Sequence, residues 1–277
     1  MLATLAAERS KRGLPPLTIS TPHPELFQGA AGVARTLPLN WGLLGAAGRM
    51  GLPACNPFYT EALPIPDHEA PPTRHILAEL CRRGGITGAV ELRTYFSVTA
   101  EELAASEPYR GALVFQASGL SGSHGMRNKE WGADKMARVA AHFSGRQPTV
   151  QLGSPQDPLL PGCVDLRGKT SLRQTAAILA NAAGFVGLIG FPMHLARAVN
   201  CPAVIVYGGR ERPWQSGYSC NLNLATAPEC SPCWRWQTCD FERRCLTEIA
   251  PAQVIAAVEE MLRRPRSALA VESATIE

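Results

Sequence analysis

The alternation of short apolar runs with helical patterns after Gly111 constrains the fold of this chain more than any other feature. The runs are rich in Val, Leu and Ile and are apolar throughout, as expected for strands buried on both faces of a parallel sheet. The pattern therefore predicts a doubly wound α/β domain. The expected strands are 112–117, 149–153, 185–189 and 203–207, and the expected helices are 128–143, 171–183, 192–199 and 251–264.

The first hundred residues follow no clear period. We expect a helix at the N-terminus, a strand over 17–21 and a helix over 73–83, with loops and short elements across 38–73. The predicted domains are a partial N-terminal α/β domain over 1–108, a Rossmann-like domain with a cysteine-rich loop over 109–264, and a loose tail over 265–277.

Composition and charge exclude several classes of protein. The 27 basic residues against 23 acidic ones leave a net charge of +4, which is too small and too scattered for nucleic-acid binding. No run reaches the roughly 18 apolar residues that a membrane helix needs, and the N-terminus lacks the pattern of a signal peptide. We therefore expect a cytoplasmic protein with at most peripheral membrane association, whose nine cysteines stay reduced.

Ligands of doubly wound sheets bind beyond the carboxyl ends of the strands, which directs attention to the loops 118–129, 153–161, 190–194 and 208–217. The first loop is rich in Gly and Ser, including Ser118 and Ser121, and ends at Lys129, one of only four lysines. Small residues let a backbone approach an anion, and the lysine supplies a charge. A solvated surface loop is the alternative interpretation.

The segment from Gly190 to His194 follows an expected strand and opens an expected helix, with Pro192 in its first turn. Free backbone amides and the helix dipole make such a turn favourable for phosphate, and His194 is placed to add a hydrogen bond. A strand-to-helix turn with a packed histidine is the alternative.

Five cysteines form the most specific local pattern. The Cys-x2-Cys pair with further cysteines at short intervals is typical of a tetrahedral thiolate site for Zn or Fe. We hypothesise that four of the five bind one structural metal ion; free, reduced cysteines in a loop are the alternative. The five are Cys220, Cys230, Cys233, Cys239 and Cys245.

Several segments together resemble glycosyltransferase family 9, the ADP-heptose:lipopolysaccharide heptosyltransferases and their relatives. The resemblance covers most of the chain, and its most specific part is Pro-Met-His-Leu-Ala at 192–196. The other segments are Lys129-Glu130-Trp131, Leu152-Gly153-Ser154-Pro155, 166–172, the Cys-x2-Cys tail and 21–27.

The resemblance implies a GT-B arrangement, in which two Rossmann-like domains face one cleft. It also implies an inverting glycosyltransferase that moves heptose or another sugar from a nucleotide-sugar donor, ADP-heptose first among them. The acceptor would be lipopolysaccharide or another glycan or protein, met at the inner face of the inner membrane. The family's first strand and catalytic base would precede Met1, so the N-terminal domain is expected to be incomplete and no catalytic residue is assigned.

The donor-binding residues are carried over position by position. Lys129 would meet the donor phosphates, and Gln156 or Asp157 would lie at the donor ribose. Leu188 and Ile189 stand where relatives have polar residues, so a catalytically degenerate nucleotide-sugar-binding or scaffold protein is the alternative. The helix N-terminus that would hold the diphosphate comprises Gly190, Pro192, Met193 and His194.

Overall fold

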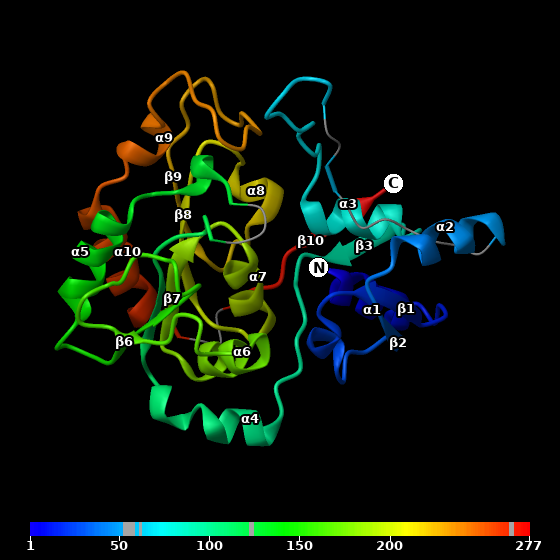
Figure 1. Ribbon diagram of the computed structural model, residues 1–277, viewed down its shortest axis with the longest axis horizontal. Coiled ribbons are helices and arrows are strands. Elements are labelled where there is room, and N and C mark those ends of the chain that lie inside the picture. Colours follow the sequence, from blue (N-terminus) through cyan, green and yellow to red (C-terminus); the bar gives the residue numbers. More distant parts are fainter. Residues whose placement is uncertain (52–58, 61–62, 122–124, 266–268) are drawn as a thin grey trace.

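The computed structural model describes residues 1–51, 59–60, 63–121, 125–265 and 269–277. Six parallel strands form the main sheet in the order β6-β5-β4-β7-β8-β9 (Figure 1). The strand order reverses between β4 and β7, so a crevice forms there beyond the carboxyl ends of the strands. The strands are β4 (Leu113–Gln116), β5 (Thr149–Leu152), β6 (Val164–Asp165), β7 (Gly184–Leu188), β8 (Ala203–Tyr207) and β9 (Leu222–Ala225).

Helices cover both faces of this sheet. Along β4 the side chains alternate between two cores: Leu113 and Phe115 pack with α5 (Ala133–Phe143) and α10 (Pro251–Arg263). Val114 faces the opposite way, toward α6 (Leu172–Asn181) and α7 (Phe191–Ala198). Because both faces are apolar and covered, the predicted doubly wound α/β domain is confirmed.

The N-terminal half is built from two small sheets and three helices. A parallel pair joins β1 (Leu17–Thr21) to β2 (Val33–Pro38), and an antiparallel pair joins β3 (Gly88–Glu91) to β10 (Ser273–Ile276). The core of this half lies between α1 (Leu2–Lys11), α3 (Ile76–Arg83) and the sheet of β3 and β10. The helical elements are α1 (Leu2–Lys11), η1 (Pro24–Phe27), α2 (Trp41–Arg49) and α3 (Ile76–Arg83).

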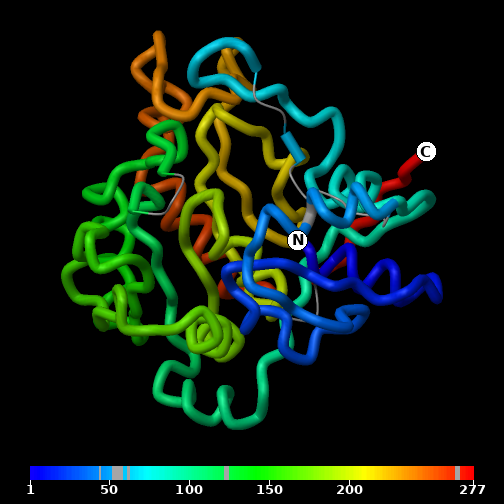
Figure 2. The backbone as a smooth tube through the Cα atoms, turned by 45° about the vertical axis from the view of Figure 1, so that its right-hand side comes forward, coloured from blue at the N-terminus to red at the C-terminus, as the bar shows by residue number. Residues whose placement is uncertain are grey.

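The C-terminal tail is not loose, and this part of the prediction is wrong. Residues 273–276 form β10 beside β3, and Ile276 is buried in the core of the N-terminal half. Figure 2 shows this last segment among the elements of the chain's beginning. A four-residue strand carries no periodicity of its own, and its partner lies far away in the sequence. Residues 266–268 of the predicted tail lie outside the described residues.

Two further segments differ from expectation. The helix predicted over 128–143 begins only at Ala133, because Gly132 before it has φ 111°, a value that a helix cannot contain. The short 3-10 helix η3 (Arg127–Lys129) precedes it. The region 38–73, expected to hold short elements, contains the nine-residue helix α2.

Four short helical elements remain. They are α4 (Ala100–Ala105) and η2 (Glu107–Tyr109), which lead into the main sheet, and α8 (Pro213–Ser216) and α9 (Arg244–Thr247), on either side of the cysteine-rich loop. In the part of the chain that the structure describes, no helix is long and apolar enough to span a bilayer.

Candidate functional site

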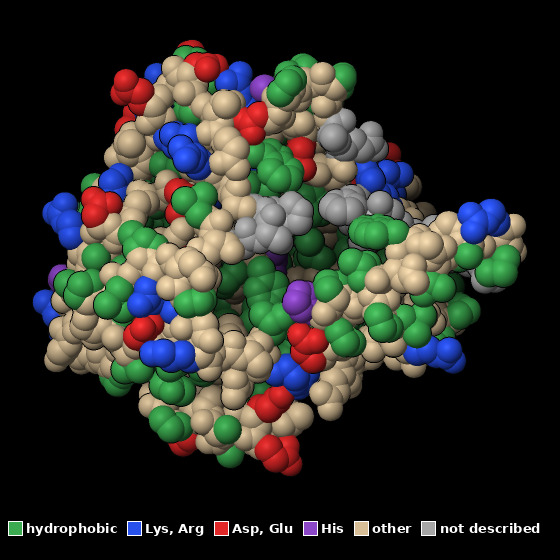
Figure 3. All heavy atoms as spheres, viewed as in Figure 1, with side chains coloured by type: hydrophobic (Ala, Val, Ile, Leu, Met, Phe, Trp, Pro, Cys, Tyr) green, Lys and Arg blue, Asp and Glu red, His purple; other side chains and the backbone are tan. Residues whose placement is uncertain are grey.

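A cavity of about 260 Å³ lies between the two halves. Figure 3 shows the hollow between them, with apolar side chains inside. Both halves line the cavity, so a ligand bound there would contact both of them. The C-terminal half contributes Lys129, Gly190, Phe191, His194 and Glu211, and the N-terminal half contributes Phe27, Tyr59, Tyr95 and Phe96, among others.

Lys129 does not extend into solvent but forms a buried ion pair. Its Nζ lies 2.6 Å from Oε1 of Glu211, and the exposed fractions of the two side chains are 16% and 3%. Burial alone would raise the pKa of Glu211, but the charges of Lys129 and Arg210 outweigh it and lower that pKa to about 2. The carboxylate is therefore ionised, and it balances the charge of Lys129.

Arg210 extends this charge network into the N-terminal half. Its guanidinium lies 3.2 Å from Glu211, donates to Glu69 and stacks 4.4 Å from the centre of the Trp234 ring. The backbone amide of Glu69 donates to the carbonyl of Trp234. Residues of alternating charge therefore lead from the cavity to the segment before α3 and join the two halves.

Sequence reasoning missed Glu211 and Arg210, although the loop 208–217 was among those expected to bind ligand. A usable pattern was present: the two charged residues follow a buried apolar strand and two glycines. Charged residues directly after a strand of a parallel sheet lie at its carboxyl edge, where ligands bind.

The start of α7 lines the same cavity as Lys129. Gly190 is its extended N-cap, and the amides of Phe191 and Met193 in the first turn have no carbonyl partner within the helix. The side chain of Met193 is buried and accepts a hydrogen bond from the Tyr207 hydroxyl, so it is not available to a ligand. Pro192 occupies the first turn, as predicted.

His194 lies one turn into the same helix. Its Nδ1 is 2.7 Å from the hydroxyl of Tyr218, and burial lowers the pKa of the imidazole to about 3. The ring is therefore neutral near pH 7, and it offers a hydrogen bond to a ligand but no positive charge.

The other predicted donor-site residues form a second cluster, outside the lining of this cavity. Ser121 donates a 2.6 Å hydrogen bond to Asp157, whose other oxygen accepts from the amide of Ser154. Ser118 is buried, and its hydroxyl accepts from the amide of Leu120. Gln156 is exposed and contacts the Ser154 hydroxyl. Residues 122–124 of the first loop lie outside the described residues.

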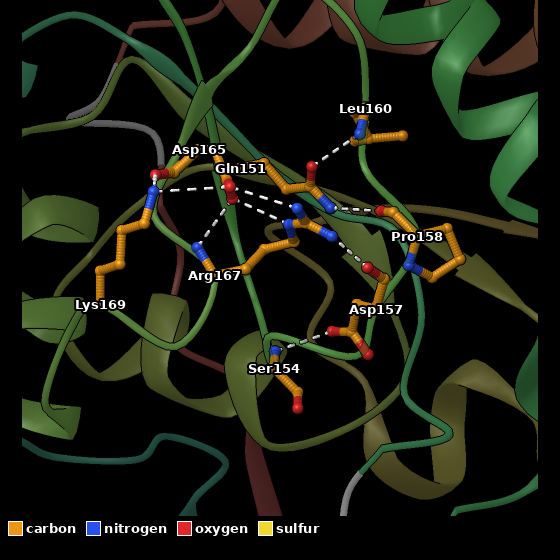
Figure 4. Close-up of polar contacts among 8 residues, drawn as sticks. All are labelled: Gln151, Ser154, Asp157, Pro158, Leu160, Asp165, Arg167 and Lys169. Carbon is orange, nitrogen blue, oxygen red and sulfur yellow. Dashed lines mark hydrogen bonds and ion pairs between the residues drawn. The ribbon is translucent and has the colours of Figure 1, made fainter.

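Asp157 holds the loop after β5 in place. Figure 4 shows its carboxylate turned to the Ser154 amide and its carbonyl accepting from Arg167, which also binds Asp165. A Cβ at Gly153, where φ is 145°, would lie 2.3 Å from the Asp157 carboxylate. The loop can pack this closely only because residue 153 is glycine, and Gln156 is left as its exposed polar side chain.

The structure separates Cys220 from the other cysteines of the predicted metal site. Cys220 packs against the core on one face of the main sheet, whereas Cys245 packs against the core on the other face. Cys220 is therefore not a ligand of a shared ion, because the sheet lies between the two thiols. The five cysteines of the predicted site form no disulfide with one another.

The remaining four cysteines lie in the loop between β9 and α10. The sulfur of Cys239 accepts hydrogen bonds from the amides of Phe241 and Arg243, both at 3.4 Å. Burial raises the pKa of the Cys233 and Cys245 thiols, and the neighbouring cysteines raise it further. Within the described residues, no group of three or more His, Cys, Asp or Glu side chains is arranged to hold a metal ion.

The doubly wound sheet, with a cavity that it shares with a second α/β unit, has the architecture of the GT-B fold. The model of glycosyltransferase family 9 (heptosyltransferase) matches residues 90–242. The chain belongs to this family, as the resemblance implied.

Curated relatives include lipopolysaccharide heptosyltransferase 3 of Escherichia coli K12, which is 28% identical over 153 residues. The match covers 48% of this chain and 43% of that relative, so the chain spans less than half the length of the relative.

Solved structures share the fold at low identity. A family 9 glycosyltransferase from Veillonella parvula DSM 2008 has a TM-score of 0.64 at 14% identity, covering 94% of this chain and 93% of that one. ADP-heptose LPS heptosyltransferase II of E. coli gives 0.63 at 15%, covering 95% of each chain. The dodecameric, iron-containing heptosyltransferase TibC in complex with ADP-D-β-D-heptose gives 0.64 at 14%, covering 92% of this chain and 70% of that one.

Proposed function

We propose that this protein transfers a heptose from ADP-heptose, with inversion, to a lipopolysaccharide or another glycan or protein acceptor on the cytoplasmic side of the inner membrane. One observation carries the proposal: Lys129 and the first turn of α7 line the same cavity between the two halves. Family membership supports a sugar nucleotide as the donor, and the structure of TibC holds ADP-D-β-D-heptose.

The diphosphate of the donor would replace Glu211 as the partner of Lys129. The amides of Phe191 and Met193 would donate to the same phosphates, and His194 would add a neutral hydrogen bond. As the acceptor hydroxyl attacks the anomeric carbon, it releases its proton to water and the bond from that carbon to the phosphate oxygen breaks. The cation and the helix N-terminus then stabilise the charge of the departing nucleoside diphosphate.

For the donor ribose we propose Gln156 rather than Asp157. The Asp157 carboxylate is already bound by Ser121 and the Ser154 amide, whereas Gln156 is exposed. Asp157 then orders the loop, and Gln156 contacts the sugar.

Calorimetric titration with ADP tests this assignment. Lys129→Ala should weaken binding about ten- to a hundredfold, because one charge-assisted hydrogen bond contributes roughly 1.5–3 kcal/mol. His194→Ala should cost less, since the backbone amides remain. Lys169→Ala is the matched control, because Lys169 is 59% exposed and pairs with Asp165.

Three results would contradict the assignment in different ways. Wild type that binds no ADP at millimolar concentration removes the transferase function together with the site. Equal affinity of wild type and Lys129→Ala shows that the diphosphate binds elsewhere. A loss in Lys169→Ala as large as that in Lys129→Ala shows that net charge alone drives binding.

A nucleotide-sugar-binding protein without transferase activity is the second candidate. Leu188 and Ile189, at the carboxyl end of β7, are both buried and apolar. These two positions therefore offer no polar side chain to a donor sugar. A donor-consumption assay beside the ADP titration separates the two candidates. Tight ADP binding without transfer or hydrolysis of ADP-heptose favours the second.

We also propose that Cys230, Cys233, Cys239 and Cys245 bind one iron or zinc ion. Amides that donate to the Cys239 sulfur are suitable partners for a thiolate, and the related TibC is iron-containing. The ion would draw the four sulfurs together and release their protons.

Elemental analysis of protein purified without added metal tests the site. Cys233→Ser should lose the ion and Cys220→Ser should retain it. Less than about one-tenth equivalent of either metal in wild type would contradict the proposal.

A further inference from the structure

Helix α2 is a nine-residue helix whose apolar side chains face solvent. Leu43, Ala46, Ala47 and Met50 recur at the i, i+3, i+4, i+7 spacing of one helix face, and we call this face the α2 stripe. Leu43 is 45% and Met50 68% exposed. Such a stripe normally packs against a core, but Figure 1 shows α2 projecting from the rest of the molecule.

The helix has little stability of its own. Asn40 caps it by accepting from the amide of Gly42, but Gly42, Gly45 and Gly48 lie within its nine residues. Each glycine costs a helix about 1 kcal/mol relative to alanine, and helices below roughly 12 residues are marginal alone in water. A surface that covers the α2 stripe would stabilise the helix.

The sequence segment around α2 carries only positive charge. Residues 26–60 contain no Asp or Glu, whereas Arg35 and Arg49 lie on either side of the stripe in the sequence and are exposed. No ion pair joins either arginine to a carboxylate of the described residues. Figure 3 shows apolar and basic side chains on the projecting helix. A partner that is apolar inside and anionic at its boundary would complement this surface.

We propose that α2 docks on an anionic lipid surface, with the α2 stripe among the acyl chains and Arg35 and Arg49 at the lipid phosphates. Trp41, at the start of the helix, is 57% exposed, and tryptophan is enriched at membrane interfaces. Apolar side chains flanked by arginines are the features of interfacial helices that select anionic membranes. Docking would hold the N-terminal half at the membrane without a spanning segment.

Co-sedimentation of the full chain with lipid vesicles tests the proposal. Wild type should bind phosphatidylglycerol-rich vesicles and leave phosphatidylcholine vesicles free. The Leu43→Ser/Met50→Ser variant should lose about tenfold or more in partitioning, because two half-inserted apolar side chains are removed. Arg35→Gln/Arg49→Gln should lose roughly fivefold per charge, and this loss should vanish in high salt.

Leu159→Ser is the matched control, because Leu159 is 53% exposed and lies on the C-terminal half. It should bind vesicles like wild type. All variants should unfold at the temperature of wild type, since the substituted side chains face solvent.

Three results would overturn the proposal. One is a failure of wild type to bind anionic vesicles at low salt, and another is an equal loss in the stripe variant and in Leu159→Ser. The third is a stripe variant that abolishes self-association while vesicle binding persists, which would show that a second copy covers α2. Vesicle binding requires neither donor nor acceptor, so none of these results bears on the ADP titration.

Discussion

Replacing Lys129 would leave the Glu211 carboxylate buried with Arg210 as its remaining cationic partner. Removing one member of a buried ion pair costs roughly 3–5 kcal/mol when nothing else compensates. Arg210 stays in place and shares the stabilisation, so we expect Lys129→Met to lose about 2 kcal/mol of unfolding free energy near pH 7. Methionine keeps most of the aliphatic volume, which separates this loss from a packing defect.

The loss should depend on pH in a defined direction. The pKa of Glu211 is lowered from 4.5 to about 2, so its contribution to stability is present above pH 4.5 and lost as the pH falls toward 2. Without Lys129 that pKa rises and the carboxyl group takes up a proton at higher pH. The difference in unfolding free energy between wild type and Lys129→Met should therefore be smaller at pH 3 than at pH 7.

Urea unfolding followed by circular dichroism measures these differences, with Glu211→Gln and the double variant completing a thermodynamic cycle. The double variant should be more stable than Lys129→Met, because it no longer buries an underpaired charge. Equal urea midpoints for wild type and Lys129→Met at pH 7, or a difference that does not shrink at pH 3, would refute the reasoning.

Three further predictions concern other parts of the molecule. Asp67 accepts hydrogen bonds from the backbone amides of residues 236–238. Asp67→Asn should weaken these hydrogen bonds by roughly 1–2 kcal/mol in total and so speed hydrogen exchange of the three amides about tenfold. Unchanged exchange rates would contradict this prediction. The imidazole of His194 should remain neutral in an NMR titration down to pH 5, because its pKa is about 3, and protonation near 6.5 would show that it is not buried. The unfolded chain binds that proton near 6.5, so His194 lowers stability as the pH falls from 6.5 toward 3. Deleting residues 270–277 removes β10 and uncovers Val90 and its neighbours in the core of the N-terminal half. Limited proteolysis should then cleave the N-terminal half first. Resistance equal to that of wild type would contradict a stabilising role for β10.

The sequence by itself determined the main sheet and the helices beside it. Strand 203–207 is observed at its predicted residues, and Pro192 marks the start of α7 as predicted. These features could be read because they are local: apolar periodicity reports burial, and proline favours the first turn of a helix. Lys129 and the turn at Gly190 were recognised for a similar reason, since both follow strands whose carboxyl ends meet at one edge of the sheet.

Only the tertiary structure decided which groups meet. It paired Lys129 with Glu211, turned Asp157 inward so that Gln156 remained exposed, and placed Cys220 on the face of the sheet opposite Cys245. It also brought β10 to β3 from the other end of the chain. A charge partner or an edge-strand partner is set by the path of the whole chain and by the burial that follows. Neither leaves a period in the local sequence, because an ion pair or a four-residue strand is specified by long-range contacts.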